Sequence, residues 1–187
     1  MSITTVILVI VAVIAVAVAA WAYMQREKTL KLRNKYGPEY DRLADHEHSA
    51  RRAETVLESR EKRVAKFNIR SLRPEEITRF AADWRVVQEH FVDNPRDAVS
   101  QADRLINEAL KARGYPMADF EQQAADLSVQ YPHVVDNYRK AHAIAEQDQA
   151  GSASTENLRK AMQYYRSLFE DVLGQNVNPM EEVRHGR

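Results

Sequence analysis

The stretch ITTVILVIVAVIAVAVAAWAY, residues 3–23, decides the fold of this chain because it is apolar throughout and carries no charge. A helix of about 21 residues is about 31 Å long, which matches a bilayer hydrocarbon core of about 30 Å. Trp21 and Tyr23 close the stretch, and aromatic side chains of this kind gather at membrane–water interfaces. The sequence therefore predicts one transmembrane anchor over residues 1–24.

A cleaved signal peptide is the alternative interpretation of the same stretch. Ala-x-Ala patterns, which suit signal cleavage, occur at residues 15–17 and 17–19. However, only Met1 and Ser2 precede the apolar run, so a positively charged n-region is missing, and the run is longer than a usual signal core. We therefore expect a retained anchor. Its Ala15 and Ala19 form a small-xxx-small pair that would let two anchors approach closely.

A basic cluster follows the anchor, whereas no lysine or arginine precedes it. The positive-inside rule then places the C-terminal domain in the cytoplasm, at the inner (cytoplasmic) membrane. A secreted or periplasm-facing domain is the alternative. The cluster serves as a stop signal, and we also expect it to face anionic lipid. Its members are Arg26, Lys28, Lys31, Arg33 and Lys35.

Residues 25–67 are predicted to hold this basic segment and a long amphipathic helix. Pro38 lacks an N–H and disfavours a helical residue before it, so a break is expected at Gly37-Pro38. Beyond the break, apolar residues recur in steps of three and four, with His46 and Arg60 between them. We expect this stripe either to dock a partner or second copy, or to pack on the rest of the domain. Its apolar members are Leu43, Ala50, Ala53, Leu57, Val64 and Phe67.

Residues 68–174 are predicted to form a bundle of about five helices, which makes the chain all-α. Pro74 suits the first turn of a helix, Asn94 is a candidate N-cap, and Gly114 and Gly174 follow two helices as stop signals. The expected inward faces include Phe80, Trp84, Val87, Phe91, Ala98, Ala102, Leu105, Ile106, Ala109, Tyr138, Tyr165 and Phe169. Residues 175–187 show no period and are predicted to be a flexible tail.

The residue types leave little room for catalysis. There is no cysteine, which removes disulfides, thiol chemistry and zinc–thiolate sites. The 27 basic and 27 acidic residues balance, so no overall field favours nucleic acid. His46 and His48 are two residues apart, about 200° around a helix, and so cannot share one ion on a continuous helix. We expect no cofactor, no bound metal, no nucleic-acid partner and no enzymatic activity.

Several segments resemble a widespread bacterial family of small proteins. The segments are KYGPEYDR (35–42), RRAETVLESREKR (51–63), WRVVQEHFVDNPRDAVSQADRLI (84–106), ARGYP (112–116) and YPHVVDNYR (131–139). Members of that family pair an N-terminal hydrophobic segment with a helical domain. The resemblance implies a bacterial membrane protein and carries over no catalytic residue. Polar positions inside these segments, namely Gln88, Asp93, Arg104, Arg113 and Tyr115, are candidates for either function or helix capping.

These features together favour a membrane-tethered interaction or scaffold domain. The lipid bilayer is one expected partner, and a protein or a second copy of the chain is the other. The alternative function is a small-ligand-binding or sensor bundle that uses the aromatic interior around Trp84 and Tyr138.

Overall fold

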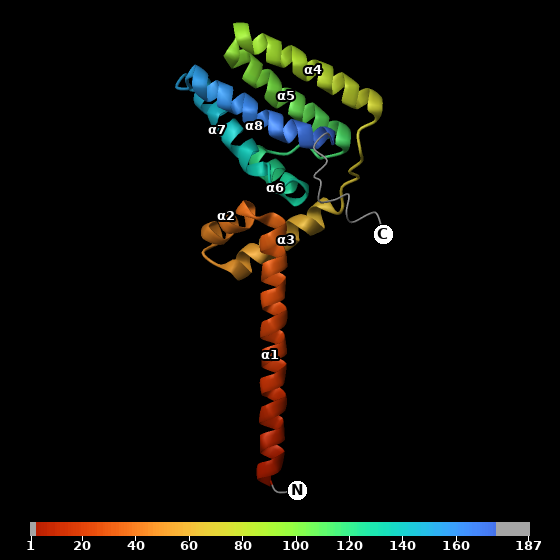
Figure 1. Ribbon diagram of the computed structural model, residues 1–187, viewed down its shortest axis with the longest axis vertical. Helices are drawn as coiled ribbons and strands as arrows, with labels where there is room; N and C mark the ends of the chain where they lie inside the picture. Colours follow the sequence, from red (N-terminus) through yellow and green to blue (C-terminus); the bar gives the residue numbers. More distant parts are fainter. Residues whose placement is uncertain (1–2, 175–187) are drawn as a thin grey trace. The chain divides into compact units, whose positions relative to one another are not determined.

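The computed structural model describes residues 3–174, which form eight α-helices and no strand (Figure 1). The helices are α1 (Ile3–Tyr36), α2 (Pro38–Glu47), α3 (Ala50–Val64), α4 (Pro74–Asp93), α5 (Pro95–Arg113), α6 (Phe120–Gln130), α7 (Val135–Gln149) and α8 (Thr155–Leu173). The predicted all-α class is confirmed for these residues. The predicted tail, 175–187, lies outside them. The chain divides within α3 into two compact units, residues 1–56 and 57–187.

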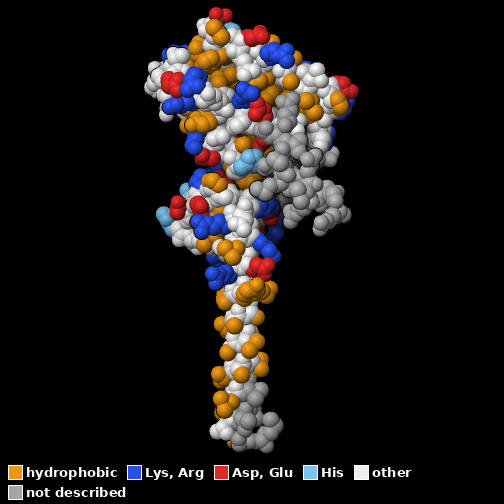
Figure 2. Space-filling model, viewed as in Figure 1, with side chains coloured by type: hydrophobic (Ala, Val, Ile, Leu, Met, Phe, Trp, Pro, Cys, Tyr) orange, Lys and Arg blue, Asp and Glu red, His pale blue; other side chains and the backbone are white. Residues whose placement is uncertain are grey.

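Helix α1 is longer than the predicted anchor. It continues through the basic segment to Tyr36 and spans 34 residues, because glutamine, arginine, lysine, glutamate and leucine, which are strong helix formers, fill most of residues 25–35. Among residues 3–174 it is the one helix long and apolar enough to cross a membrane. Figure 2 shows hydrophobic side chains along the length of this helix. Large apolar side chains in its first part are more than half exposed, namely Ile7, Leu8, Ile10, Val11, Val13, Ile14, Val16 and Val18.

The predicted break at Gly37-Pro38 is confirmed. Gly37 adopts a φ of 49°, and α2 begins at Pro38. A second break was not predicted, so the expectation of one continuous helix over residues 43–67 is wrong. His48 takes the left-handed conformation with a φ of 50° and ends α2. The Ser49 hydroxyl then accepts the Arg52 N–H at 3.4 Å, which provides the first turn of α3 with a local hydrogen-bond acceptor.

In residues 3–56, the first turns of α3 pack against both α1 and α2. The Glu54 carboxylate accepts hydrogen bonds from the Thr29 hydroxyl of α1 at 2.6 Å and from the Tyr40 hydroxyl of α2 at 3.3 Å. Glu54 is 6% exposed, and Tyr40 and Ala53 are buried. A buried carboxylate that joins three helices fixes their arrangement, because leaving it without hydrogen bonds would be costly.

In residues 57–174, α7 packs on α8, α4 on α5, and α5 on α8 (Figure 1). The inward faces predicted for these helices are largely confirmed. Buried members are Phe80, Trp84, Val87, Ala98, Ala102, Leu105, Ile106, Ala109, Tyr138, Tyr165 and Phe169, whereas Phe91 is half-buried at the edge. The core therefore lies between α4, α5, α7 and α8, and Ala124 and Leu127 of α6 belong to it as well.

Helix ends in this unit follow the expected capping chemistry. The Asn94 side chain accepts the Asp97 N–H at 3.3 Å and caps α5. Gly114 ends the same helix with a φ of 96°, and the Tyr115 N–H donates to the Leu110 carbonyl at 3.1 Å. Gly174 ends α8 in the same left-handed conformation.

The second half of α3 is held by α6. The Arg60 guanidinium donates to the Ser128 hydroxyl at 3.0 Å, and the Arg63 guanidinium donates to the Asp126 carboxylate at 3.0 Å. Leu57 and Val64 are buried and share a helical face with Arg60. Both halves of α3 are therefore packing elements.

Candidate functional site

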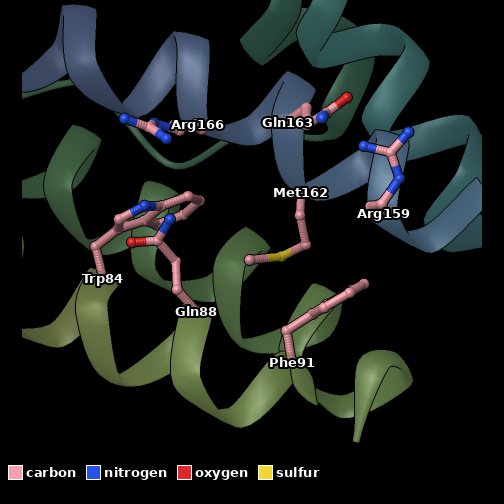
Figure 3. A pocket seen from close by; sticks show the side chains of 7 residues that line it. All are labelled: Trp84, Gln88, Phe91, Arg159, Met162, Gln163 and Arg166. Atoms are coloured by element: carbon pink, nitrogen blue, oxygen red, sulfur yellow. The ribbon is translucent and has the colours of Figure 1, made fainter.

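A surface groove with an apolar floor lies between α4 and α8 (Figure 3). Its lining residues are Trp84, Gln88 and Phe91 on α4, and Arg159, Met162, Gln163 and Arg166 on α8. In Figure 3 the α4 side chains rise toward α8, and Met162 points from α8 toward α4. The two helices thus place apolar groups at the bottom and polar groups at the rim.

The central ring of the groove floor is stacked on a core aromatic ring. The Trp84 indole lies on the Phe169 ring with 4.6 Å between centroids and 20° between planes. Trp84 is 7% exposed and Met162 is 8% exposed. Phe91 is only half-buried, so part of its ring remains available to a side chain from another molecule.

The charged rim is balanced within α8. The Arg159 guanidinium pairs with Glu156 at 2.7 Å, and this hydrogen bond lowers the pKa of the Glu156 carboxyl. Arg166 pairs with Glu170 at 2.6 Å. Each guanidinium is more than half exposed and carries five N–H donors, so it can bind a further acceptor from another molecule.

The groove is small. Its volume is about 170 Å³, whereas pockets for drug-sized ligands hold roughly 300–1,000 Å³. A second hollow of about 380 Å³, between the start of α6 and α7, is larger but is lined mostly by charged and polar groups around the stacked rings of Phe120 and His142. The size of the α4–α8 groove therefore suits one inserted side chain better than a small molecule.

The aromatic interior around Tyr138 is filled by its own side chains. Tyr138 is 1% exposed and lies 5.0 Å from Phe120 and 6.2 Å from Tyr165, centroid to centroid. The Tyr165 hydroxyl donates to the Asp103 carboxylate at 3.0 Å. Burial is the main cause that raises the pKa of both tyrosines, so both hydroxyls stay protonated at neutral pH.

The predicted basic cluster lies on the C-terminal third of α1, and part of it is paired with acids. Lys31 pairs with Glu27 at 2.8 Å, and Arg33 pairs with Asp41 of α2 at 3.2 Å. The Glu27 carboxylate raises the pKa of the Lys31 ammonium through this hydrogen bond. Arg26, Lys28 and Lys35 are exposed on the same helix.

The predicted apolar stripe is not exposed as one surface. Leu43, Ala53, Leu57 and Val64 are buried, Phe67 is half-buried, and Ala50 is exposed. The second half of the stripe lies on the same face of α3 as Arg60, which binds α6. The structure therefore supports the packing alternative for most of these residues.

Arg113 and Tyr115 have structural contacts. The Arg113 guanidinium donates to the Tyr131 hydroxyl, to the Val172 carbonyl at 3.0 Å and to the Arg70 carbonyl at 3.2 Å. The Tyr115 hydroxyl donates to Gln130 at 2.6 Å. By contrast Gln88, Asp93 and Arg104 are exposed, and of these only Gln88 lies at the groove.

No cluster of metal-ligating side chains was found in the part of the chain that the structure describes. His46 contacts its neighbour Glu47 at 3.3 Å, and His48 forms the helix end at which α2 stops. No family model, curated protein or solved structure matches this chain.

One contact near the anchor was not predicted from the sequence. The Arg51 guanidinium lies over the Trp21 ring, 5.8 Å from the ring centroid. Thirty residues of sequence separate the two side chains, and both helix breaks, at Gly37 and at His48, lie between them. The one sequence feature that could have indicated a site here is the adjacent basic pair Arg51-Arg52.

Proposed function

We propose that this chain is a membrane-anchored helical protein in which α1 crosses the bilayer once and residues 57–174 form a domain that binds a protein partner. The exposed apolar surface of α1 carries the proposal. Complete burial of one such side chain is worth about 1.5–3 kcal/mol. Exposed side chains at positions 8, 10, 11, 13, 14, 16 and 18 are distributed around the whole circumference of the helix. A single partner helix would cover one face, whereas lipid covers all of them.

The charge distribution supports a cytoplasmic domain. The basic residues of α1 all follow its apolar part, from Arg26 onward. Positive charges next to a span are retained on the cytoplasmic side. In this orientation the first residues face the outside, and the helical domain faces the cytoplasm at the inner membrane.

The α4–α8 groove is the proposed partner site because it combines an apolar floor with a polar rim. Val92, the residue after Phe91 in α4, is a further exposed apolar side chain, at 82%. Central apolar anchors surrounded by polar groups are typical of protein interfaces. A partner helix or peptide that presents one large aliphatic or aromatic side chain fits this geometry, and the role is binding rather than catalysis.

Site-specific photo-crosslinking in intact bacterial membranes tests this assignment. A photoreactive residue at Gln163, on the groove, is expected to give a defined adduct. The same residue at Lys160, exposed on α8 but outside the groove lining, is the matched control and is expected to give none. Phe91→Asp should abolish the Gln163 adduct. Equal adducts at both positions, or an adduct that survives Phe91→Asp, would contradict the groove as the partner site.

A further inference from the structure

The first turn of α3 lies next to the end of the apolar part of α1. Glu54 binds Thr29, and Arg51, one turn earlier in α3, lies over Trp21. From Thr29 to Trp21 is eight residues, or about 12 Å along α1 toward its N-terminus. The α2–α3 turn, residues 48 and 49, and the first residues of α3 therefore fold back toward the apolar segment, as Figure 1 shows within this unit.

This corner is held firmly. The Tyr40 and Thr29 hydroxyls both bind Glu54, and Ala53 between Arg52 and Glu54 has no exposed surface. Arg51 and Arg52 are themselves exposed. The helix packing therefore fixes the position of Arg51 along α1, and Arg52 is the next residue on the same turn of α3.

The position of Trp21 and Arg51 along α1 corresponds to the lipid headgroup layer. Headgroup layers add about 5–7 Å on each side of the hydrocarbon core, and an interfacial tryptophan marks the boundary between them. Trp21 is 55% exposed at the end of the apolar stretch. A guanidinium 5.8 Å from its ring centroid lies within the headgroup layer when α1 spans the bilayer.

The side-chain chemistry fits a phosphate. An arginine stacked on an aromatic face keeps its N–H edges accessible, and these edges bind phosphate oxygens in pairs. Lys31 and Arg33, which lie further along α1 toward its C-terminus, are already paired with Glu27 and Asp41. Arg51 and Arg52 thus add positive charge closer to the bilayer than these two paired residues of the basic cluster.

We propose that Arg51, Arg52 and Trp21 form a binding site for the headgroups of anionic phospholipids, which fixes the α2–α3 corner to the membrane surface. The inference rests on the proposed insertion of α1. The proposed lipid-facing surface thus includes a second helix, α3, besides the basic cluster of α1. Its proposed ligand is a lipid headgroup and not free phosphate.

Energy transfer from Trp21 to labelled lipid tests the proposal in the full chain. Trp84→Phe leaves Trp21 as the sole tryptophan, since the chain has two. The protein is reconstituted in phosphatidylcholine vesicles that contain a small fraction of chain-labelled phosphatidylglycerol or chain-labelled phosphatidylcholine. Transfer to phosphatidylglycerol should exceed transfer to phosphatidylcholine. Each arginine should contribute roughly five-fold to the local enrichment, since one basic residue near an anionic surface is worth about 1 kcal/mol.

The variants separate this site from the basic cluster. Arg51→Gln combined with Arg52→Gln should remove most of the preference, and Arg52→Gln alone, which leaves the Trp21 contact intact, should remove part of it. Arg51→Lys should keep most of it. The matched control is Arg79→Gln, which removes an arginine that lies over a ring, Phe80, at 4.6 Å in the other unit, and it should keep the full preference.

An unchanged preference for phosphatidylglycerol in the double variant would overturn the site. So would a wild-type preference that disappears when millimolar inorganic phosphate is added at constant ionic strength. Failure of the proposed anchoring looks different. In that case alkaline carbonate would extract the wild-type chain, and Trp21 would transfer energy to neither lipid.

Discussion

Gly114 sits where the backbone of another segment leaves no room for a side chain. Its φ is +96°, and a Cβ at this position would lie 2.3 Å from the Asn68 carbonyl oxygen. Gly114→Ala should therefore lower the free energy of unfolding by about 2–4 kcal/mol, through left-handed strain and the clash together. Urea unfolding of the full chain in mild detergent, followed by Trp84 fluorescence in a Trp21→Phe background, measures this.

Gly174 is the matched control for this substitution. Its φ is +73°, but within residues 3–174 no atom lies within 4 Å of the position that a Cβ would take. Gly174→Ala should cost only the backbone strain, about 1 kcal/mol. Equal losses at the two positions would show that the Asn68 contact contributes nothing.

Glu76 should make the unfolding free energy of the domain depend on pH in the acidic range. The Arg70 guanidinium donates to this carboxylate at 2.7 and 2.8 Å, and the Arg73 N–H donates at 2.8 Å. These bonds hold the pKa of Glu76 well below its ordinary value of 4.5. Because the folded pKa is depressed, the stabilisation is complete above pH 4.5 and is lost as the pH falls toward the folded pKa.

Glu76→Gln should therefore reduce the fall in unfolding free energy on acidification below pH 4.5. Glu75→Gln, one residue earlier and outside these hydrogen bonds, should keep the wild-type acid dependence. Urea titrations at a series of pH values compare the three proteins. Identical acid profiles for wild type and Glu76→Gln would contradict the assignment.

Individual residues were predictable where the chemistry is local. Asn94 and Gly114 cap α5 as expected, because capping depends on a few neighbouring residues. The roles of Arg113 and Arg51 were not predictable. Arg113 binds the Val172 carbonyl 59 residues away, and Arg51 meets Trp21 across a reversal of chain direction.

At the scale of helices, α3 should behave as a packing element. Leu57 has no exposed surface, so Leu57→Ala should cost about 2–5 kcal/mol of unfolding free energy. Ala50 belongs to the same predicted stripe but is exposed, and Ala50→Ser should change stability by less than about 0.5 kcal/mol. Unchanged stability in Leu57→Ala, together with weaker self-association in analytical ultracentrifugation, would instead restore the stripe as a docking surface.

The two breaks before α3 differ in how visible they are in the sequence. Pro38 lacks the N–H that a helix needs, so its break follows from one residue. At His48 no residue forbids a helix. The heptad-like pattern continues through the break, because periodicity depends only on which side chains are apolar. The turn is instead stabilised by the Ser49 cap and the buried Glu54, which a periodic pattern does not indicate.

For the whole molecule, helices and inward faces were predictable from the sequence, but the pairing of helices was not. An amphipathic pattern predicts which face of a helix is buried, but it does not predict which helix packs against that face. The α4–α8 groove depends on such a pairing, since Trp84 is stacked on Phe169 from α8. Both aromatics were expected in the core, and the groove at its edge was therefore missed.

Protease accessibility of a C-terminal tag tests most directly the claim that α1 anchors a cytoplasmic domain. The full chain is expressed in bacteria and treated with protease in spheroplasts and, separately, in inverted inner-membrane vesicles. We expect a protected tag in spheroplasts and a cleaved tag in inverted vesicles. Cleavage in spheroplasts with protection in inverted vesicles would contradict this claim and place the helical domain on the outer side of the membrane.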